Sequence, residues 1–266
     1  MMPTNSKFVV LVAAAALALL SGCASTNAPK ADPLEGLNRA TYAFNDAVDT
    51  AVFTPVAKGY KAVTPGFLRA GITNLFTNIG DVATALNNVL QGKGGDAASD
   101  ASRFLVNSTL GVLGLFDVAT PMGLEKHNAD FGQTMGKWGV GSGPFLMLPL
   151  MGPSTLRDAL GRPVDAYAGY SRYVDHIPTR NTAFGVEVID LRANLLGASS
   201  TLDTAALDKY QFLRDAYLQR RLRSIYDGKV PQDKLDQLEN DLLPPKSDTN
   251  TAPQSESKAE PKDQPK

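Results

Sequence analysis

The sequence predicts a mainly α-helical body, which we place at Asp32 to Leu243. Three observations point to this class. Apolar residues recur at steps of three and four over several segments, which is the spacing of one face of a helix. Asp, Thr and Pro stand where helices would start, and Gly stands where they would end. Few stretches alternate apolar and polar residues in the period of two that a half-buried strand requires.

The residues ahead of this body predict an export signal. Lys7 supplies a positive start, and the 13 residues from Phe8 to Leu20 are all apolar. A helix that spans a bilayer needs about 20 apolar residues, so this run is too short to be one. We therefore expect residues 1–22 to be a signal peptide that is removed.

Cys23 is the only cysteine of the chain, and it ends the run Leu20-Ser21-Gly22-Cys23. This run resembles the bacterial lipobox, which predicts that Cys23 becomes the acylated first residue of the mature protein. Two or more acyl chains hold a protein on a membrane stably, whereas one chain is marginal. Ala24 and Ser25 place no acidic residue behind the cysteine, which favours the outer membrane. Residues 23–31 would be the lipidated cysteine and a tether; the alternative is an ordinary signal peptide that ends in a small residue.

Start signals mark the first helices. Asp32, Pro33 and Glu35 fit an N-cap, a first-turn proline and a capping-box partner, and an apolar stripe follows as far as Val52. Thr54-Pro55 and Thr64-Pro65 repeat the signal, and a second stripe begins at Leu68 and ends at Ile79. Gly80 and Gly92 are predicted stops, which leaves Asp81 to Leu90 as a short helix of its own.

Three further helices are predicted later in the chain. One begins near Asp96 and passes through Phe104 toward Leu110. No Gly or Pro occurs between Ala198 and Asp227, where apolar residues form stripes, so we expect one long helix there. A short helix at Gln232 to Leu243 is the last. The tail at 244–266 is rich in Pro, Ser and charged residues, which predicts disorder.

Two long segments of the body carry almost no charge. Residues 104–124 contain only Asp117, and residues 138–156 contain none. Seven Gly and Pro residues interrupt the second segment, which excludes a simple spanning helix, and its centre at 145–151 is an apolar loop or hairpin. Both segments could be buried interior. Backbone rich in Gly and Pro is hard to bury with its polar groups satisfied, however, so on a lipid-anchored chain we favour contact with lipid.

The net charge, the single cysteine and the absence of complete catalytic motifs exclude several classes of function. The formal net charge is −1, and the mature chain would carry 25 basic and 27 acidic residues, so nucleic acid is not an expected partner. No intrachain disulfide can form with a single cysteine. Asp130-Phe131-Gly132 lacks the other kinase motifs, residues 132–137 lack the spacing of a nucleotide-binding loop, and no Gly-x-Ser-x-Gly elbow occurs. We expect no metal, no cofactor and no enzymatic activity.

Basic residues gather on the predicted late helix, at Arg214, Arg220, Arg221 and Arg223. One interpretation is a solvated face whose partners are Asp215 and Asp227. The other is a surface that guides phosphate headgroups or docks an acidic partner.

Two blocks of sequence resemble the MlaA/VacJ family of outer-membrane lipoproteins. The first is DPLEGLNRATYAFNDAVD (32–49); the second is GLFDVAT (114–120) with GLEKHNADFGQTMGKWGVGSGPFLMLPLMGPSTLRD (123–158). The resemblance extends from Asp32 to about Tyr226. It implies a ring-like, multi-helix body around an amphipathic channel, lying within the outer membrane and associated with a trimeric porin. Family members remove misplaced phospholipid from the outer leaflet and pass it to a periplasmic carrier, which maintains lipid asymmetry.

The resemblance also implies which residues serve the lipid passage. A flexible hairpin near its mouth would correspond to Phe145, Leu146, Met147, Leu148, Pro149, Leu150 and Met151, flanked by Gly143, Pro144, Gly152 and Pro153. Phe44 and Asn45 are the residues expected to control access. Two alternatives remain: a porin-binding envelope adaptor that moves no lipid, and a periplasmic enzyme that modifies lipid.

Overall fold

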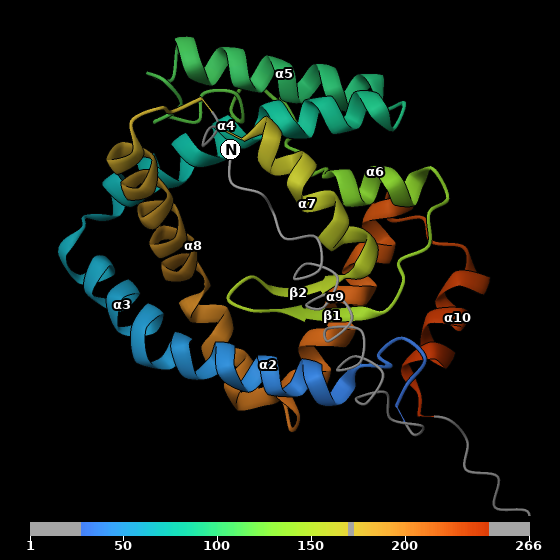
Figure 1. Cartoon of the computed structure of the whole chain (residues 1–266). Coiled ribbons are helices and arrows are strands. Elements are labelled where there is room, and N and C mark those ends of the chain that lie inside the picture. Colours follow the sequence, from blue (N-terminus) through green and yellow to red (C-terminus); the bar gives the residue numbers. More distant parts are fainter. Residues whose placement is uncertain (1–27, 170–172, 245–266) are drawn as a thin grey trace, which may run out of the picture.

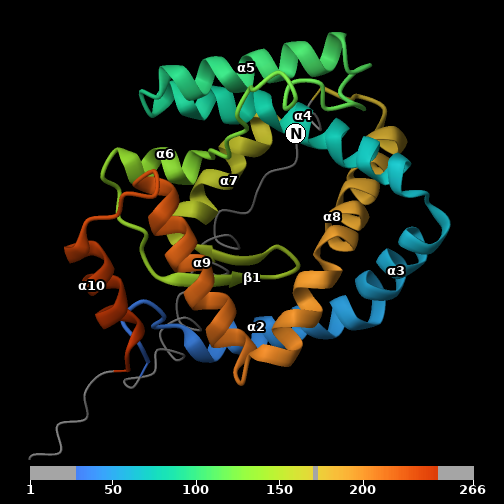
Figure 2. The ribbon, with the colours of Figure 1, turned by 180° about the vertical axis from the view of Figure 1, so that it is seen from behind.

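The computed structural model describes residues 28–169 and 173–244, and within these ranges the chain is mainly α-helical. The predicted signal peptide, Cys23 and the tail from 245 onward lie outside the described residues. The helices form a ring, and both ribbon views place one short hairpin inside it (Figures 1 and 2). The elements are α2 (Glu35–Val48), η1 (Asp49–Phe53), α3 (Thr54–Val63), α4 (Gly66–Leu90), α5 (Gly94–Thr109), α6 (Phe131–Lys137), β1 (Phe145–Leu148), β2 (Gly152–Thr155), α7 (Leu156–Ala168), α8 (Ile177–Ala205), α9 (Lys209–Ile225) and α10 (Gln232–Leu242).

The first arc of the ring is one bent helical run made of α2, the π-helical turn η1 and α3 (Figure 1). Pro55 explains the wide turn, because it offers no N–H to the carbonyl of Ala51 and its ring crowds that carbonyl. The predicted Thr54 cap is therefore wrong: the helix continues through Thr54, whose hydroxyl donates to Asp49 (2.9 Å). Asp49 also pairs with Arg192 of α8 through two hydrogen bonds, which fixes the bend against this neighbouring helix.

Asp32 does not cap α2, contrary to the sequence prediction. The helix begins at Glu35 without a side-chain cap, and the Asp32 carboxylate is fully buried instead. It accepts hydrogen bonds from Asn38 (2.7 Å), Tyr210 and Arg214. The residues just before it also belong to the body, because the Ala31 N–H donates to the Asp241 carbonyl. The predicted tether is therefore shorter than residues 23–31.

Gly80 does not end a helix: α4 runs without a break from Gly66 to Leu90. One glycine in a helix interior is destabilising by only about 1 kcal/mol, and α4 packs along α5, so the tertiary contact outweighs it. The predicted stop at Gly92 is confirmed, with φ of +76° two residues past the helix. The predicted helix toward Leu110 is also confirmed as α5, which begins two residues before Asp96.

The long helix predicted between Ala198 and Asp227 is two helices. α8 ends at Ala205, and Asp208 starts α9 by accepting from the Gln211 N–H (3.0 Å) while it binds Arg39 of α2 (2.8 Å). The break therefore includes an ion pair to the neighbouring helix α2. The sequence predictions missed α6, α7 and most of α8, whereas α10 matches the short last helix.

Polar contacts close the ring where α3, α4 and α8 meet. Asp190 of α8 is buried and accepts from Tyr60 of α3 (2.9 Å) and Thr73 of α4 (2.6 Å). Burial and the neighbouring carboxylate raise the pKa of Tyr60 to about 12. The main hydrophobic cluster lies elsewhere, where β1 meets α9 through Phe145, Met147, Tyr210 and Leu218.

Candidate functional site

The segment predicted as an apolar loop or hairpin forms a two-stranded antiparallel hairpin. Phe145 pairs with Thr155 and Leu148 pairs with Gly152. Phe145 and Met147 are buried, whereas Leu146 and Leu148, on the opposite face, are half-buried. The Phe145 ring lies edge-on to Tyr210, with 6.2 Å between ring centroids. One face of the hairpin is thus fixed to α9.

Two asparagines of α2 hold the outer edge of β1. Asn38 donates to the Phe145 carbonyl (3.0 Å) and accepts from the Met147 N–H (2.8 Å). Asn45 repeats the pattern with the Leu148 carbonyl (2.9 Å) and the Leu150 N–H (2.8 Å). Residues seven apart lie on the same face of a helix, so the two amides act as a third strand. They satisfy the edge that β2 leaves unpaired.

The tip of the hairpin, Pro149 to Met151, is apolar and exposed. Leu150 is 57% exposed, and its φ of +61° lies in the left-handed region that residues other than glycine rarely adopt. Such a conformation typically costs about 1–3 kcal/mol and persists only where its surroundings enforce it. The hydrogen bonds to Asn45 are the described contacts that hold this backbone.

The other predicted site residues lie in different settings. Phe44 is 52% exposed and points about 100° around α2 from Asn45, so it does not share the asparagine's contact with the hairpin. Gly143 and Pro144 precede β1, as predicted for a flank. Gly152 and Pro153 are not flanks, because both lie in β2 and pair with Leu148 and Met147. The acylation site at Cys23 lies outside the described residues.

A buried ion-pair cluster lies at the foot of the hairpin. Arg221 of α9 bridges Asp130 (2.9 Å) and Asp158 (2.7 Å), and Tyr217 donates to Asp158 (2.7 Å). Burial alone would raise the pKa of Asp158, but Arg221, Arg157 and Tyr217 outweigh it and lower that pKa. The carboxylate therefore stays ionised and ties α9 to the start of α7.

The four arginines of α9 divide into two pairs. Arg214 and Arg221 are partly or fully buried among carboxylates, which agrees with the predicted partner Asp215. Asp227 is not such a partner, because it binds Lys93 and Lys137. Arg220 and Arg223 are exposed.

Polar cavities lie beside this cluster. One, of about 560 Å³, is lined by the ends of α4 and α9, and a second, of about 390 Å³, is lined by α4, α7 and α9. The two share Asn128, Gln133 and Arg220, and we call them together the polar groove. The second cavity includes Arg162, whose guanidinium donates to the Pro153 carbonyl of the hairpin (3.4 Å). The polar groove thus reaches the hairpin.

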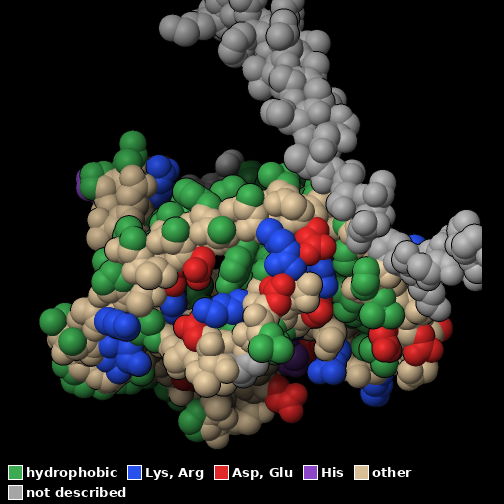
Figure 3. Space-filling model, turned by 90° about the horizontal axis from the view of Figure 1, so that it is seen from below, with side chains coloured by type: hydrophobic (Ala, Val, Ile, Leu, Met, Phe, Trp, Pro, Cys, Tyr) green, Lys and Arg blue, Asp and Glu red, His purple; other side chains and the backbone are tan. Residues whose placement is uncertain are grey.

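In this fold many polar residues are buried and many large hydrophobic residues are exposed, which is the reverse of a typical water-soluble protein. Among the described residues, nineteen buried residues are polar or charged and only nine are hydrophobic. Large hydrophobic side chains are exposed on most helices and on the 110–124 loop, where Leu110, Val112, Leu113 and Phe116 all face outward. Seen from below, charged side chains of both signs gather near the middle of the face, with hydrophobic ones along its margins (Figure 3). Such an exposed apolar surface marks a contact with lipid or another protein.

The described ranges lack two features. No described helix combines the length and the apolar composition of a membrane-crossing segment. In residues 28–169 and 173–244, no three side chains of His, Cys, Asp or Glu come together as they would around a metal ion.

The residues that hold the hairpin were only partly predictable. The family resemblance pointed to Asn45 as a residue that controls access, not as one that holds the hairpin. Asn38 was missed, although it lies seven residues earlier on the same face of α2. A polar residue repeated at helical spacing within an apolar stripe is the signal that could have found it.

Comparison with known proteins gives a consistent result. Residues 30–224 match the family model described as MlaA lipoprotein. The chain is 34% identical over 209 residues to the Escherichia coli K12 intermembrane phospholipid transport system lipoprotein MlaA, covering 76% of this chain and 82% of that one. The Haemophilus influenzae protein of the same name is 30% identical over 252 residues, covering 91% and 98%. An uncharacterized protein of Rickettsia bellii is 35% identical over 195 residues, covering 73% and 76%.

A solved structure shares the fold as well. It is described as the structural basis for maintenance of bacterial outer membrane lipid asymmetry, and it superposes with a TM-score of 0.65 at 34% sequence identity. The match covers 73% of this chain and 98% of the solved chain.

Proposed function

The chain belongs to the MlaA lipoprotein family, and we propose that it removes misplaced phospholipids from the outer leaflet of the outer membrane and passes them to a periplasmic carrier. In this proposal Cys23 anchors the protein by its acyl chains, and the ring lies in the bilayer beside a trimeric porin. The result is the maintenance of lipid asymmetry, the role that describes the solved relative.

The observation that carries the proposal is that polar side chains are buried while large hydrophobic side chains are exposed. A protein that lies in hydrocarbon must satisfy its backbone and polar groups internally and turn apolar side chains outward. In the described body, most buried side chains are polar or charged, among them asparagines, threonines and ion-paired residues, and large hydrophobic side chains are exposed on its outer faces.

A phospholipid needs two environments during passage. Its charged headgroup requires polar partners, because burying a charge without them is far too costly, whereas its tails require apolar wall or lipid. The polar groove supplies the first, and the exposed hydrophobic side chains supply the second. The hairpin reaches into the ring, and its apolar tip would control the passage (Figure 2). No bond needs to break, so we propose a passive conduit and not an enzyme.

The anchor fits this placement. Cys23 precedes Ala28, the first described residue, by five residues, which span at most about 18 Å. The chain then contacts the root of the hairpin directly, because the Phe145 N–H donates to the Ala31 carbonyl (2.8 Å). The acyl chains would therefore hold the hairpin side of the ring near the membrane.

Reconstitution tests the proposal. Acylated protein is placed in vesicles that contain fluorescent phospholipid, and a soluble carrier collects what is released. Intact lipid on the carrier supports a conduit. Chemically altered lipid would favour an enzyme, and capture of a porin without any lipid transfer would favour the adaptor. A Cys23→Ala variant that can no longer be acylated should lose membrane attachment and transfer together.

A further inference from the structure

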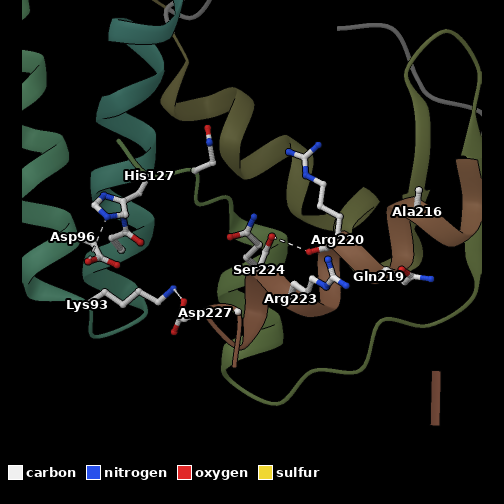
Figure 4. Close-up of a pocket in the computed structure, with 13 residues that line it drawn as sticks. Lys93, Asp96, His127, Ala216, Gln219, Arg220, Arg223, Ser224 and Asp227 are labelled. Atoms are coloured by element: carbon white, nitrogen blue, oxygen red, sulfur yellow. Dashed lines mark hydrogen bonds and ion pairs between the residues drawn. The ribbon is translucent and has the colours of Figure 1, made fainter. Parts of the chain in front are cut away.

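We infer that Arg220 and Arg223 form a binding site for the phosphate group of a phospholipid headgroup, inside the larger cavity of the polar groove. The inference rests on the proposed function and adds a specific site to it. Figure 4 shows both side chains on neighbouring turns of α9, at the wall of the cavity that also includes Lys93, His127 and Asp227.

The first observation is an imbalance of charge partners. In the polar groove, Asp130 and Asp158 already pair with Arg221, and Asp227 pairs with Lys93 and Lys137. Asp96 lies 3.6 Å from the Nε2 atom of His127. In contrast, neither the Arg220 nor the Arg223 guanidinium donates a hydrogen bond to any described residue. Two cations in one cavity therefore lack the anion that a guanidinium binds best.

The second observation is the shape and position of the site. The cavity of about 560 Å³ is an open hollow within the size range of sites for small ligands. Arg220 also borders the second cavity, which continues to the foot of the hairpin through Arg162. A phosphate held by Arg220 would thus lie on the path proposed for the headgroup.

The third observation is an apolar margin beside the cavity. Leu90 precedes Lys93 by three residues and is exposed, and Trp138 is 56% exposed next to Lys137. The Trp138 indole donates to the Leu90 carbonyl (3.0 Å), which fixes the ring there. Tryptophan with one polar and one apolar side is typical of a boundary between lipid and water. Leu90 and Trp138 can contact the acyl chains next to the glycerol while the arginines hold the phosphate. This arrangement favours a lipid over an acidic protein as the ligand.

The test measures headgroup binding to the full-length protein in detergent micelles. The probe is sn-glycero-3-phosphoethanolamine, with inorganic phosphate as the second arm, and titration calorimetry reports both affinities. The double variant Arg220→Gln with Arg223→Gln should bind the glycerophosphodiester at least about tenfold more weakly than the wild type, because charge-assisted hydrogen bonds are lost. Lys58→Gln, an exposed charge on α3, is the matched control and should bind normally. The Arg→Lys double variant should fall between, since it keeps the charge and loses the planar fork.

The outcomes separate the possibilities. Unchanged binding by the folded double variant overturns the site, and so does tighter binding of inorganic phosphate than of the diester. If the wild type transfers phospholipid but does not bind the diester, the inference fails and the proposed function stands. If the wild type transfers no lipid, the proposed function fails. A double variant with normal diester affinity that loses transfer only with the carrier present would assign the arginines to an acidic protein instead.

Discussion

Replacing Asn45 with alanine should release the tip of the hairpin without unfolding the ring. The substitution removes two hydrogen bonds, one to the Leu148 carbonyl and one from the Leu150 N–H. Each is worth about 0.5–1.5 kcal/mol net, and water can replace part of both because the tip is exposed. The left-handed strain at Leu150 also favours release. We therefore expect the tip to loosen by about 1–2 kcal/mol, a factor of about 5–30 in its opening equilibrium.

Hydrogen exchange measured by mass spectrometry reports this change directly. In the peptide that covers residues 145–152, the Leu150 amide should exchange about 5–30 times faster in the variant. The Met147 amide, which Asn38 holds, should keep its protection because its partner is buried and intact. Thr41→Ala is the matched control: it lies on α2 between the two asparagines, and among the described residues its hydroxyl binds only the Leu37 carbonyl of its own helix.

Equal exchange rates at Leu150 in the wild type and the variant would refute the reasoning, since the tip would then be held by something other than Asn45. Exchange that rises equally at Met147 would also refute it, because the asparagines would then not act on separate parts of the strand. Phospholipid transfer measured on the same samples shows whether a looser tip changes the passage.

Three further substitutions test separate parts of the structure. Leu148→Lys should reduce lipid transfer severalfold with anchoring intact. The control Leu207→Lys, on the exposed link between α8 and α9, should leave transfer unchanged. Normal outer-leaflet lipid in the Leu148→Lys variant would count against the role of the hairpin. Gly161→Ala should lower the free energy of unfolding by about 1–3 kcal/mol in denaturant titrations, because the new Cβ would lie 2.8 Å from the backbone of α6. The control Gly197→Ala places its Cβ in open space and should be neutral or stabilising. Burial would raise the pKa of Asp117, but hydrogen bonds from Thr120, Asn107 and Arg103 lower it to about 2. Its ionised form therefore stabilises the fold above pH 3.8, the ordinary pKa, and this contribution is lost as the pH falls toward 2. The difference in Tm between the wild type and Asp117→Asn should shrink over that range, and a constant difference would contradict it.

Local signals predicted the elements that depend on local chemistry. The helix stops before Gly92 because this residue has a left-handed backbone conformation, which glycine adopts without strain. The hairpin follows from breakers around a short apolar run. Prediction failed where a distant partner decides the outcome: Asp32 has the residue type of an N-cap, but Tyr210 and Arg214 draw its carboxylate into the interior.

The candidate site shows the same division. Arginines on α9 were visible as a basic side, but only the fold shows that Arg214 and Arg221 are engaged and that Arg220 and Arg223 are not. Arg214 and Arg221 are seven residues apart and so share one face of the helix, whereas Arg220 and Arg223 lie on other faces, but this spacing does not say which face is buried. The separation comes from the carboxylates that α6 and α7 bring against one face of α9.

The sequence by itself determined the helical class and the position of the apolar hairpin, because both are written in neighbouring residues. The export and lipidation signals at the N-terminus stay predictions, since they lie outside the described residues. The ring was expected from the family resemblance alone and is confirmed by the structure. Only the tertiary structure decided that two asparagines replace a missing strand and that most buried side chains are polar. A hydrogen bond or an ion pair between residues a hundred positions apart depends on where the whole chain places them, and no local period encodes that distance.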